Sequence, residues 1–195
     1  MNKFYNSKIH HRKSIRLQNY DYSQNGYYFI TICTQNKNCL LGKVENDEII
    51  LNQFGKIAKD YWLKIEKLHS FVKLDYFTIM LNHIHGIIII DKNVGVPLVG
   101  TQDSDKTKSI SKNQGRPQGI APTKTIGELI GEFKSLTTNE YIKNVKLGKF
   151  PSSEKRIWQR NYYEHIIRNE KSLVKIQEYI ICNPATWEKD ELFIE

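Results

Sequence analysis

The stretch Asn82-His83-Ile84-His85-Gly86-Ile87-Ile88-Ile89-Ile90-Asp91 places two histidines at the head of an apolar, β-branched run. Four consecutive isoleucines bounded by Asp91-Lys92-Asn93 predict a buried β-strand. Because side chains alternate across a strand, His83 and His85 point to the same face. Neutral imidazole is a common ligand for divalent metals, so the pair predicts a metal site; a His-x-His that only forms hydrogen bonds is the simpler alternative.

The composition is that of a globular protein with an excess of positive charge. The 195 residues can bury a core as a single domain, 1–195, and the hydrophobic content of 39% argues against wholesale disorder. The formal net charge of +8 favours an acidic partner such as nucleic acid, although a basic protein without such a partner fits as well. The three cysteines lack a CxxC spacing, the start lacks a signal-peptide pattern, and no apolar run could cross a bilayer. We therefore expect a cytoplasmic protein with no membrane contact.

Two segments lack the periodicity of helices and strands. Residues 1–16 form a basic arm in which Arg12, Lys13 and Arg16 could bind phosphates or could simply be solvated. Residues 95–124 are rich in glycine, proline and small polar residues and predict a flexible insertion. The insertion follows the histidine strand and could cover a bound substrate, although a tolerated surface loop is the simpler interpretation.

The other segments predict strands and helices in alternation. Besides the histidine run, strands are expected over 27–34, 72–80 and 156–163, and a small hairpin over 43–51. Apolar residues at helical spacing predict three helices.

Each predicted helix begins after a residue suited to capping. The N-caps are Asn52, Thr125, which opens a capping box, and Asn169. The last helix runs to Cys182, because Asn183-Pro184 cannot continue it.

With the hairpin set aside, the order strand, helix, strand, strand, helix, strand predicts a ferredoxin-like βαββαβ fold of the α+β class. Its antiparallel sheet would carry helices on one face, with the hairpin added and a C-terminal helix following. Tyr179 lies on that last helix, beside the apolar stripe and next to Lys175 and Asn183. Taken alone, this position favours packing over catalysis for the tyrosine.

Several segments form a combined pattern: 16–34, 82–86, 158–165 with Arg168, and 178–184. Read together, they resemble the REP-associated tyrosine transposases of the HUH single-tyrosine transposase family. The resemblance extends over nearly the whole chain outside the 95–124 insertion.

The resemblance implies a role for four residues. His83 and His85 would be the metal ligands, and Tyr179 would be the catalytic tyrosine. Asn183 stands where related insertion-sequence transposases supply a third ligand, usually glutamine. Asparagine is one methylene shorter and here precedes proline, so a water or another acceptor could complete the site.

These residue types also suit phosphodiester chemistry. Mg²⁺ or Mn²⁺ held by the histidines would neutralise the scissile phosphate, and Tyr179 would attack phosphorus. Tyr162 and Tyr163 are rival nucleophiles because they stand beside His165, although packing or base stacking is the more common use of such a pair.

Two further arginines could contact DNA. Arg160 and Arg168 are candidate phosphate clamps, with ordinary surface charge as the alternative.

The resemblance implies a substrate of single-stranded DNA next to hairpins of repetitive palindromes. The leading hypothesis is a transposase-like enzyme that nicks and transfers such DNA through a 5′-phosphotyrosine intermediate. The alternatives are a catalytically inactive DNA-hairpin-binding protein of the same fold and a His-x-His hydrolase of small phosphoesters. Some relatives form a homodimer and exchange tyrosine helices while others act alone, so the oligomeric state stays open.

Overall fold

The computed structural model describes residues 16–193 apart from 18, 46–47, 93–123 and 154–155. Arg12, Lys13 and nearly all of the predicted insertion at 95–124 lie outside the described residues. The turn of the predicted hairpin also lies outside them.

A four-stranded antiparallel sheet forms the centre of the fold, in the order β4-β5-β1-β6. Its strands are β1 (Gly26–Cys33), β4 (Val72–Ile79), β5 (His83–Ile90) and β6 (Tyr163–Ile167). This order and the helices between the strands confirm the predicted βαββαβ arrangement. The predicted hairpin is also present, as β2 (Gly42–Glu45) and β3 (Glu48–Leu51).

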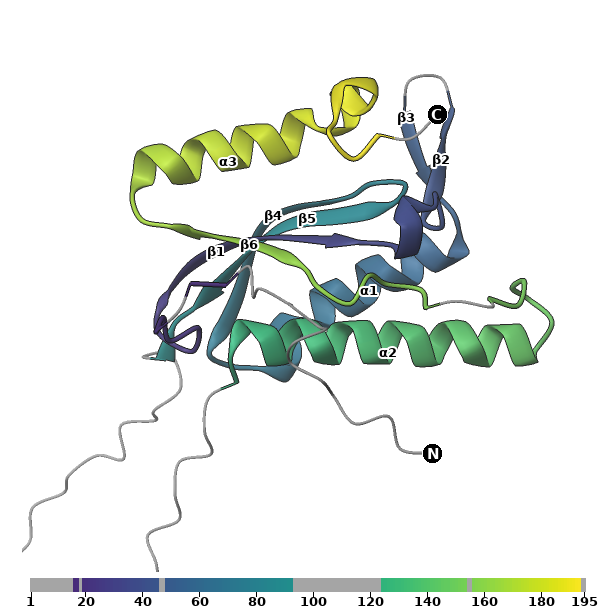
Figure 1. Ribbon diagram of the computed structural model, residues 1–195, viewed down its shortest axis with the longest axis horizontal. Helices are drawn as coiled ribbons and strands as arrows, with labels where there is room; N and C mark the ends of the chain where they lie inside the picture. The colour runs from purple at the N-terminus through teal and green to yellow at the C-terminus, as the bar shows by residue number, and fades with distance from the viewer. Residues whose placement is uncertain (1–15, 18, 46–47, 93–123, 154–155, 194–195) are drawn as a thin grey trace, which may run out of the picture.

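The two faces of the sheet carry different helices (Figure 1). α1 (Gln53–Leu68) and α2 (Ile126–Lys146) lie against one face, while α3 (Glu170–Cys182) crosses the other. Most of the buried apolar side chains, including Tyr28 and Ile84, lie on the α1–α2 side. Among the described residues, no helix combines the length and hydrophobicity needed to cross a membrane.

The three predicted helix caps are confirmed by their hydrogen bonds. Asn52 Oδ1 accepts from the Gly55 amide at 2.9 Å, and Asn169 Oδ1 accepts from the Ser172 amide at 2.9 Å. Thr125 forms a complete capping box with Glu128. Local side-chain chemistry therefore sets where each helix begins.

The predicted strand over 156–163 is wrong. The fourth strand is β6, which begins only at Tyr163, and before that residue the predicted range makes a single described bridge, from Trp158 to Thr34. Trp158 and Tyr162 are instead buried in the core, where the Trp158 indole donates to Thr137 Oγ1 at 2.9 Å. The aromatic residues suggested a strand from composition, but they serve as packing residues on an irregular segment.

Helix α2 is the longest helix of the described residues, with 21 residues. It continues to Lys146 because Tyr141 and Val145 extend its packed face against the core.

Candidate active site

The two histidines lie side by side at the start of β5, on the sheet face that α3 covers. Their ring centroids are 4.3 Å apart, and both side chains are buried. In the strand register, His85 lies opposite Thr31 of β1 and opposite Thr78 of β4. The alternation predicted from the sequence therefore places both imidazoles on one face.

Asn82 fixes the orientation of the His83 ring. Its amide nitrogen donates to the carbonyls of Lys37 at 3.0 Å and Leu192 at 2.9 Å, so its oxygen must be the acceptor for His83 Nδ1, 2.8 Å away. With its proton on Nδ1, the ring keeps a lone pair on Nε2. That Nε2 atom is buried and has no hydrogen-bond partner.

Thr31 orients the His85 ring as Asn82 orients the ring of His83. Its Oγ1 lies 2.8 Å from His85 Nδ1 and can accept the proton of that nitrogen. The lone pair of Nε2 is then free to face the space beneath α3. Both histidines can thus present Nε2 to the same point.

Tyr179 reaches this point from α3. Its hydroxyl lies 3.1 Å from His85 Nε2, although the two residues are 94 positions apart in the sequence. Phe29 stacks on His85 and meets the Tyr179 ring edge-on, which helps hold the phenol over the sheet. The residue remains 45% exposed, so the cluster is not sealed off from solvent at Tyr179.

Asp190 is the residue that the sequence analysis missed. It follows the 3₁₀ segment Pro184–Lys189, whose Trp187 is buried against Met80 and Leu81. Asp190 Oδ2 accepts from the Tyr179 hydroxyl at 3.2 Å and lies 3.9 Å from His85 Nε2. In sequence it is one acidic residue among the charges of the C-terminal segment, so neither spacing nor periodicity could have identified it.

Asn183 also belongs to the cluster. Its side chain is buried, and its Nδ2 donates to Asp190 Oδ2. Its Oδ1 atom is buried without a hydrogen-bond partner. The structure therefore brings Tyr179, His83, His85 and Asn183 together, and it adds Asp190.

The protonation states suit a cluster that binds a cation. Burial, reinforced by the neighbouring His85, lowers the pKa of His83 to about 3, so its imidazole is neutral at pH 7. Burial, together with the Asp190 charge, raises the pKa of Tyr179 to about 12. Burial acts to raise the pKa of Asp190, but the neighbouring His85 and hydrogen bonds from the Asn183 side chain and the Leu192 backbone amide hold it well below its ordinary value.

The donor set fits a divalent cation. One ligand atom each from His83, His85 and Asp190 lies within 4.8 Å of the other two. Two imidazoles and a carboxylate suit a transition metal or Mg²⁺ with open positions. The unpartnered Nε2 of His83 and Oδ1 of Asn183 are two buried atoms that a cation would satisfy.

Of the two rival tyrosines, neither contacts the cluster. Tyr162 is buried in the main core, where burial raises its pKa above the ordinary value. Tyr163 is exposed and shares the sheet face of the histidines, because it pairs with Thr31 of β1. It lies two strands away from His85 in the sheet order.

The described arginines lie outside the cluster. Arg16 stacks over the Tyr162 ring at 4.6 Å and lies 3.8 Å from Glu164, near the start of α2. Arg160 and Arg168 are exposed. Arg168 lines a cavity of about 440 Å³ with His165, at the start of α3.

Sequence comparison relates the chain to a protein of similar length. No family model matches the chain. A protein of Haemophilus influenzae, described only as uncharacterized, is 42% identical over 197 residues, which cover 98% of each chain.

A structure comparison gives two solved structures, of which the first has a similar fold. One is a REP-associated tyrosine transposase bound to a REP hairpin, with a TM-score of 0.53 and 17% identity over 90% of this chain and 74% of that chain. The other, a putative transposase from Deinococcus radiodurans R1, has a TM-score of 0.45 and 14% identity over 86% and 96%. The chain therefore belongs to one family with the Haemophilus influenzae protein, and it shares the fold of the REP-associated tyrosine transposases that its sequence resembles.

Proposed function

We propose that this protein is a transposase-like enzyme that nicks single-stranded DNA and transfers the cut strand through Tyr179. The main support is the position of the Tyr179 hydroxyl, 3.1 Å from His85 Nε2 and 3.2 Å from Asp190 Oδ2. A nucleophile, two imidazoles and a carboxylate converge there from β5, α3 and the C-terminal segment. Such an arrangement is suited to covalent catalysis on a phosphodiester.

His83, His85 and Asp190 would hold Mg²⁺ or Mn²⁺, with the Asn183 oxygen as a further ligand. A cation bound there would neutralise the charge of the scissile phosphate and favour the ionised form of the phenol. Asn82 and Thr31 keep the two rings in the orientation that this requires.

In the reaction, the Tyr179 oxygen forms a bond to phosphorus while the bond from phosphorus to the 3′ oxygen breaks. The phenol loses one proton and the departing 3′ oxygen gains one, so the products are a 5′-phosphotyrosine and a free 3′-hydroxyl. Attack by a 3′-hydroxyl on the phosphotyrosine reverses the step and joins strands. No external energy source is needed, because one phosphoester bond replaces another.

Asp190 would orient the phenol more than it would deprotonate it. A carboxylate whose pKa is held below its ordinary value is a weak base for a phenol whose pKa is about 12. By accepting the hydrogen bond of the Tyr179 hydroxyl, Asp190 would instead hold the phenol oxygen beside the histidines.

The proposed substrate is single-stranded DNA flanked by a hairpin. The structurally similar REP-associated transposase was solved with a REP hairpin, and the net charge of +8 suits a nucleic acid. Arg160 and Arg168 would contact phosphates outside the cluster, and Arg12, Lys13 and Arg16 remain predicted contacts. Arg16 would bind a phosphate while it remains stacked on the Tyr162 ring.

The decisive experiment is a search for the covalent adduct. Wild-type protein incubated with hairpin-flanked single-stranded DNA and Mn²⁺ should give a protein–DNA band that survives denaturation, and chelation of the metal should abolish it. Tyr179→Phe should remove the adduct and retain DNA binding, while Tyr163→Phe serves as the matched control. An undiminished adduct with Tyr179→Phe would reject Tyr179.

The same assay separates the alternatives. Salt-dependent hairpin binding without an adduct at any metal concentration would indicate an inactive DNA-binding protein. Turnover of a small phosphodiester that survives Tyr179→Phe would indicate a hydrolase.

A further inference from the structure

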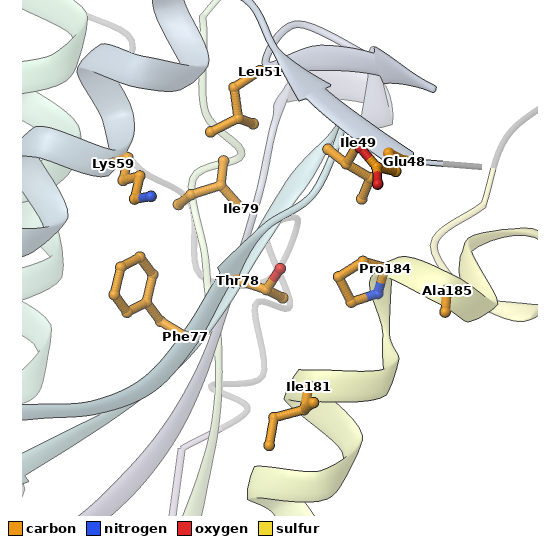
Figure 2. Close-up of a pocket in the computed structure, with 10 residues that line it drawn as sticks. All are labelled: Glu48, Ile49, Leu51, Lys59, Phe77, Thr78, Ile79, Ile181, Pro184 and Ala185. Carbon is orange, nitrogen blue, oxygen red and sulfur yellow. The ribbon is translucent and has the colours of Figure 1, made fainter. Parts of the chain in front are cut away.

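A cavity of about 490 Å³ opens beside the candidate active site, at the outer edge of β4 (Figure 2). Side chains of β3, α1, β4, the end of α3 and the 3₁₀ segment Pro184–Lys189 surround it. Two of its residues adjoin the cluster directly: Thr78 lies opposite His85 in the sheet, and Pro184 follows Asn183. We call this cavity the β4 pocket.

The β4 pocket combines apolar walls with a few polar groups. Phe77, Ile181 and Pro184 provide apolar surface, whereas the Thr78 hydroxyl, the Glu48 carboxylate and the Lys59 ammonium can form hydrogen bonds. Its volume lies within the range of small-molecule sites, about 300 to 1,000 Å³. Because β4 is at the edge of the sheet, its outer backbone groups are also available to a ligand.

Ile181 gives a further indication that this pocket is occupied in a complex. The side chain is 57% exposed, although it stands on α3 only two positions after Tyr179. A flat ligand placed against Ile181 and Pro184 would remove this apolar surface from water.

We propose that the β4 pocket receives the base of a nucleotide next to the scissile phosphate. This inference rests on the proposed function, because it requires that phosphate to lie at His85. Neighbouring strands are about 4.8 Å apart, so a phosphate at His85 and a base beyond Thr78 are within reach of one nucleotide.

A nucleobase suits the pocket better than an added peptide strand. A base has an apolar face that stacks on flat surfaces and an edge that bonds to hydroxyl, carboxylate and ammonium groups. An added strand would need a regular edge, but the register of β4 shifts between Leu74 and Phe77. Lys59 and the net charge of +8 also favour a nucleotide.

The test compares DNA-binding affinities of protein variants and DNA variants, and it requires no DNA cleavage. Binding of hairpin-flanked single-stranded DNA is measured by fluorescence anisotropy with Tyr179→Phe protein, using intact DNA and DNA with one abasic site at each position around the cleavage site. One position adjacent to the scissile phosphate should show about tenfold weaker binding, the scale of one lost stacking contact.

Adding Ile181→Glu should weaken binding of intact DNA about tenfold and should abolish the abasic penalty at that one position. Ile142→Glu is the matched control, because Ile142 is 46% exposed on α2, away from the pocket. It should retain the parent affinity and the full abasic penalty. Thr78→Val, which removes only the hydroxyl, is a second variant should Ile181→Glu fail to fold.

If the pocket variants keep the full abasic penalty at every position, no base enters the β4 pocket and the inference is wrong. A dimer that Ile181→Glu converts to monomer, with unchanged abasic penalties, would show a second copy as the occupant and would also overturn it. The adduct assay on wild-type protein is a separate measurement. If an adduct forms but the pocket variants keep the full abasic penalty, only the pocket inference is rejected. If the pocket variants abolish the abasic penalty but no adduct forms, only the nicking activity is rejected.

Discussion

The Asp190 carboxylate accepts hydrogen bonds from several groups of the candidate site. Its Oδ2 accepts from Tyr179 and Asn183, while its Oδ1 accepts from the Leu192 amide at 2.6 Å. The carboxylate is therefore held in place before any cation binds. A preorganised ligand of this kind raises metal affinity because little conformational freedom is lost on binding.

Replacing Asp190 with asparagine should weaken Mn²⁺ binding by at least about tenfold, because the charge is lost while the shape is kept. Calorimetric titration of the wild type and the variant with Mn²⁺ measures the difference. Glu191→Gln removes a neighbouring charge and is the control. Equal affinities of Asp190→Asn and wild type would show that Asp190 is not a ligand.

Gly86 is required because Trp62 packs directly against β5. A Cβ atom at this position would lie 2.4 Å from Trp62 Cζ2, and Trp62 is fully buried. Gly86→Ala should therefore lower the free energy of unfolding by about 2 kcal/mol, measured by urea denaturation. Gly131→Ala is the control, because α2 has open space at that position and alanine favours a helix. Equal effects of the two substitutions would contradict this account.

At the scale of elements, α3 is held more loosely than the other two long helices. Only Ile180 of this helix is fully buried, against the small cluster that contains Ile87 and Ile167. Besides the contacts of the Tyr179 hydroxyl, a polar contact adds to this packing, since Gln177 Nε2 donates to Asp75 Oδ2 of β4 at 2.7 Å. The position of Tyr179 over the histidines therefore depends on few interactions.

Gln177→Ala should slow adduct formation about tenfold in single-turnover assays and should lower the free energy of unfolding by only about 1 kcal/mol. The physical reason is that α3 loses the bond that fixes its angle on β4. Lys175→Ala, on the same helix, is the control. An unchanged rate would mean that apolar packing alone positions Tyr179.

At the scale of the whole molecule, the sheet separates the side that holds the main core from the side that holds the candidate site. The main core lies between the sheet and α1 with α2, and it includes most of the buried aromatic residues. The cluster of His83, His85 and Asp190 lies on the thinner side beneath α3. The side of the candidate site can thus adjust its packing without disturbing the core.

Lys134 links the core to the segment before β6. Its ammonium donates to the carbonyls of Gln159 at 3.0 Å and Asn161 at 2.8 Å. Burial, with Arg16 nearby, lowers the pKa of Lys134 to about 8. Between pH 8 and the ordinary lysine pKa of about 10.4, the unfolded state binds more protons than the folded state, so this residue makes stability rise with pH.

The free energy of unfolding of the wild type, relative to Lys134→Met, should therefore increase by an amount on the order of 2 kcal/mol from pH 7 to pH 10. Urea denaturation at a series of pH values measures the difference. Tyrosine ionisation affects both proteins and cancels in the comparison. A difference that is constant with pH would show that the ammonium is not desolvated in the folded protein.

The sequence by itself determined what depends on near neighbours in the chain. Period-two alternation placed His83 and His85 on one face, and short-range hydrogen bonding set the helix starts at Asn52, Thr125 and Asn169. The order of elements was sufficient for the antiparallel βαββαβ arrangement. The strand predicted at 156–163 failed because aromatic composition does not distinguish a strand from a packed irregular segment.

Only the tertiary structure decided which distant groups meet. Asp190 reaches the histidines because Trp187 is buried beside Met80 and Leu81, and Asn82 bonds the Leu192 carbonyl. Tyr179, and not Tyr163, lies next to His85 because α3, and not β6, crosses above that histidine. Contacts of this kind depend on how several elements pack at once, so no local pattern of residues records them.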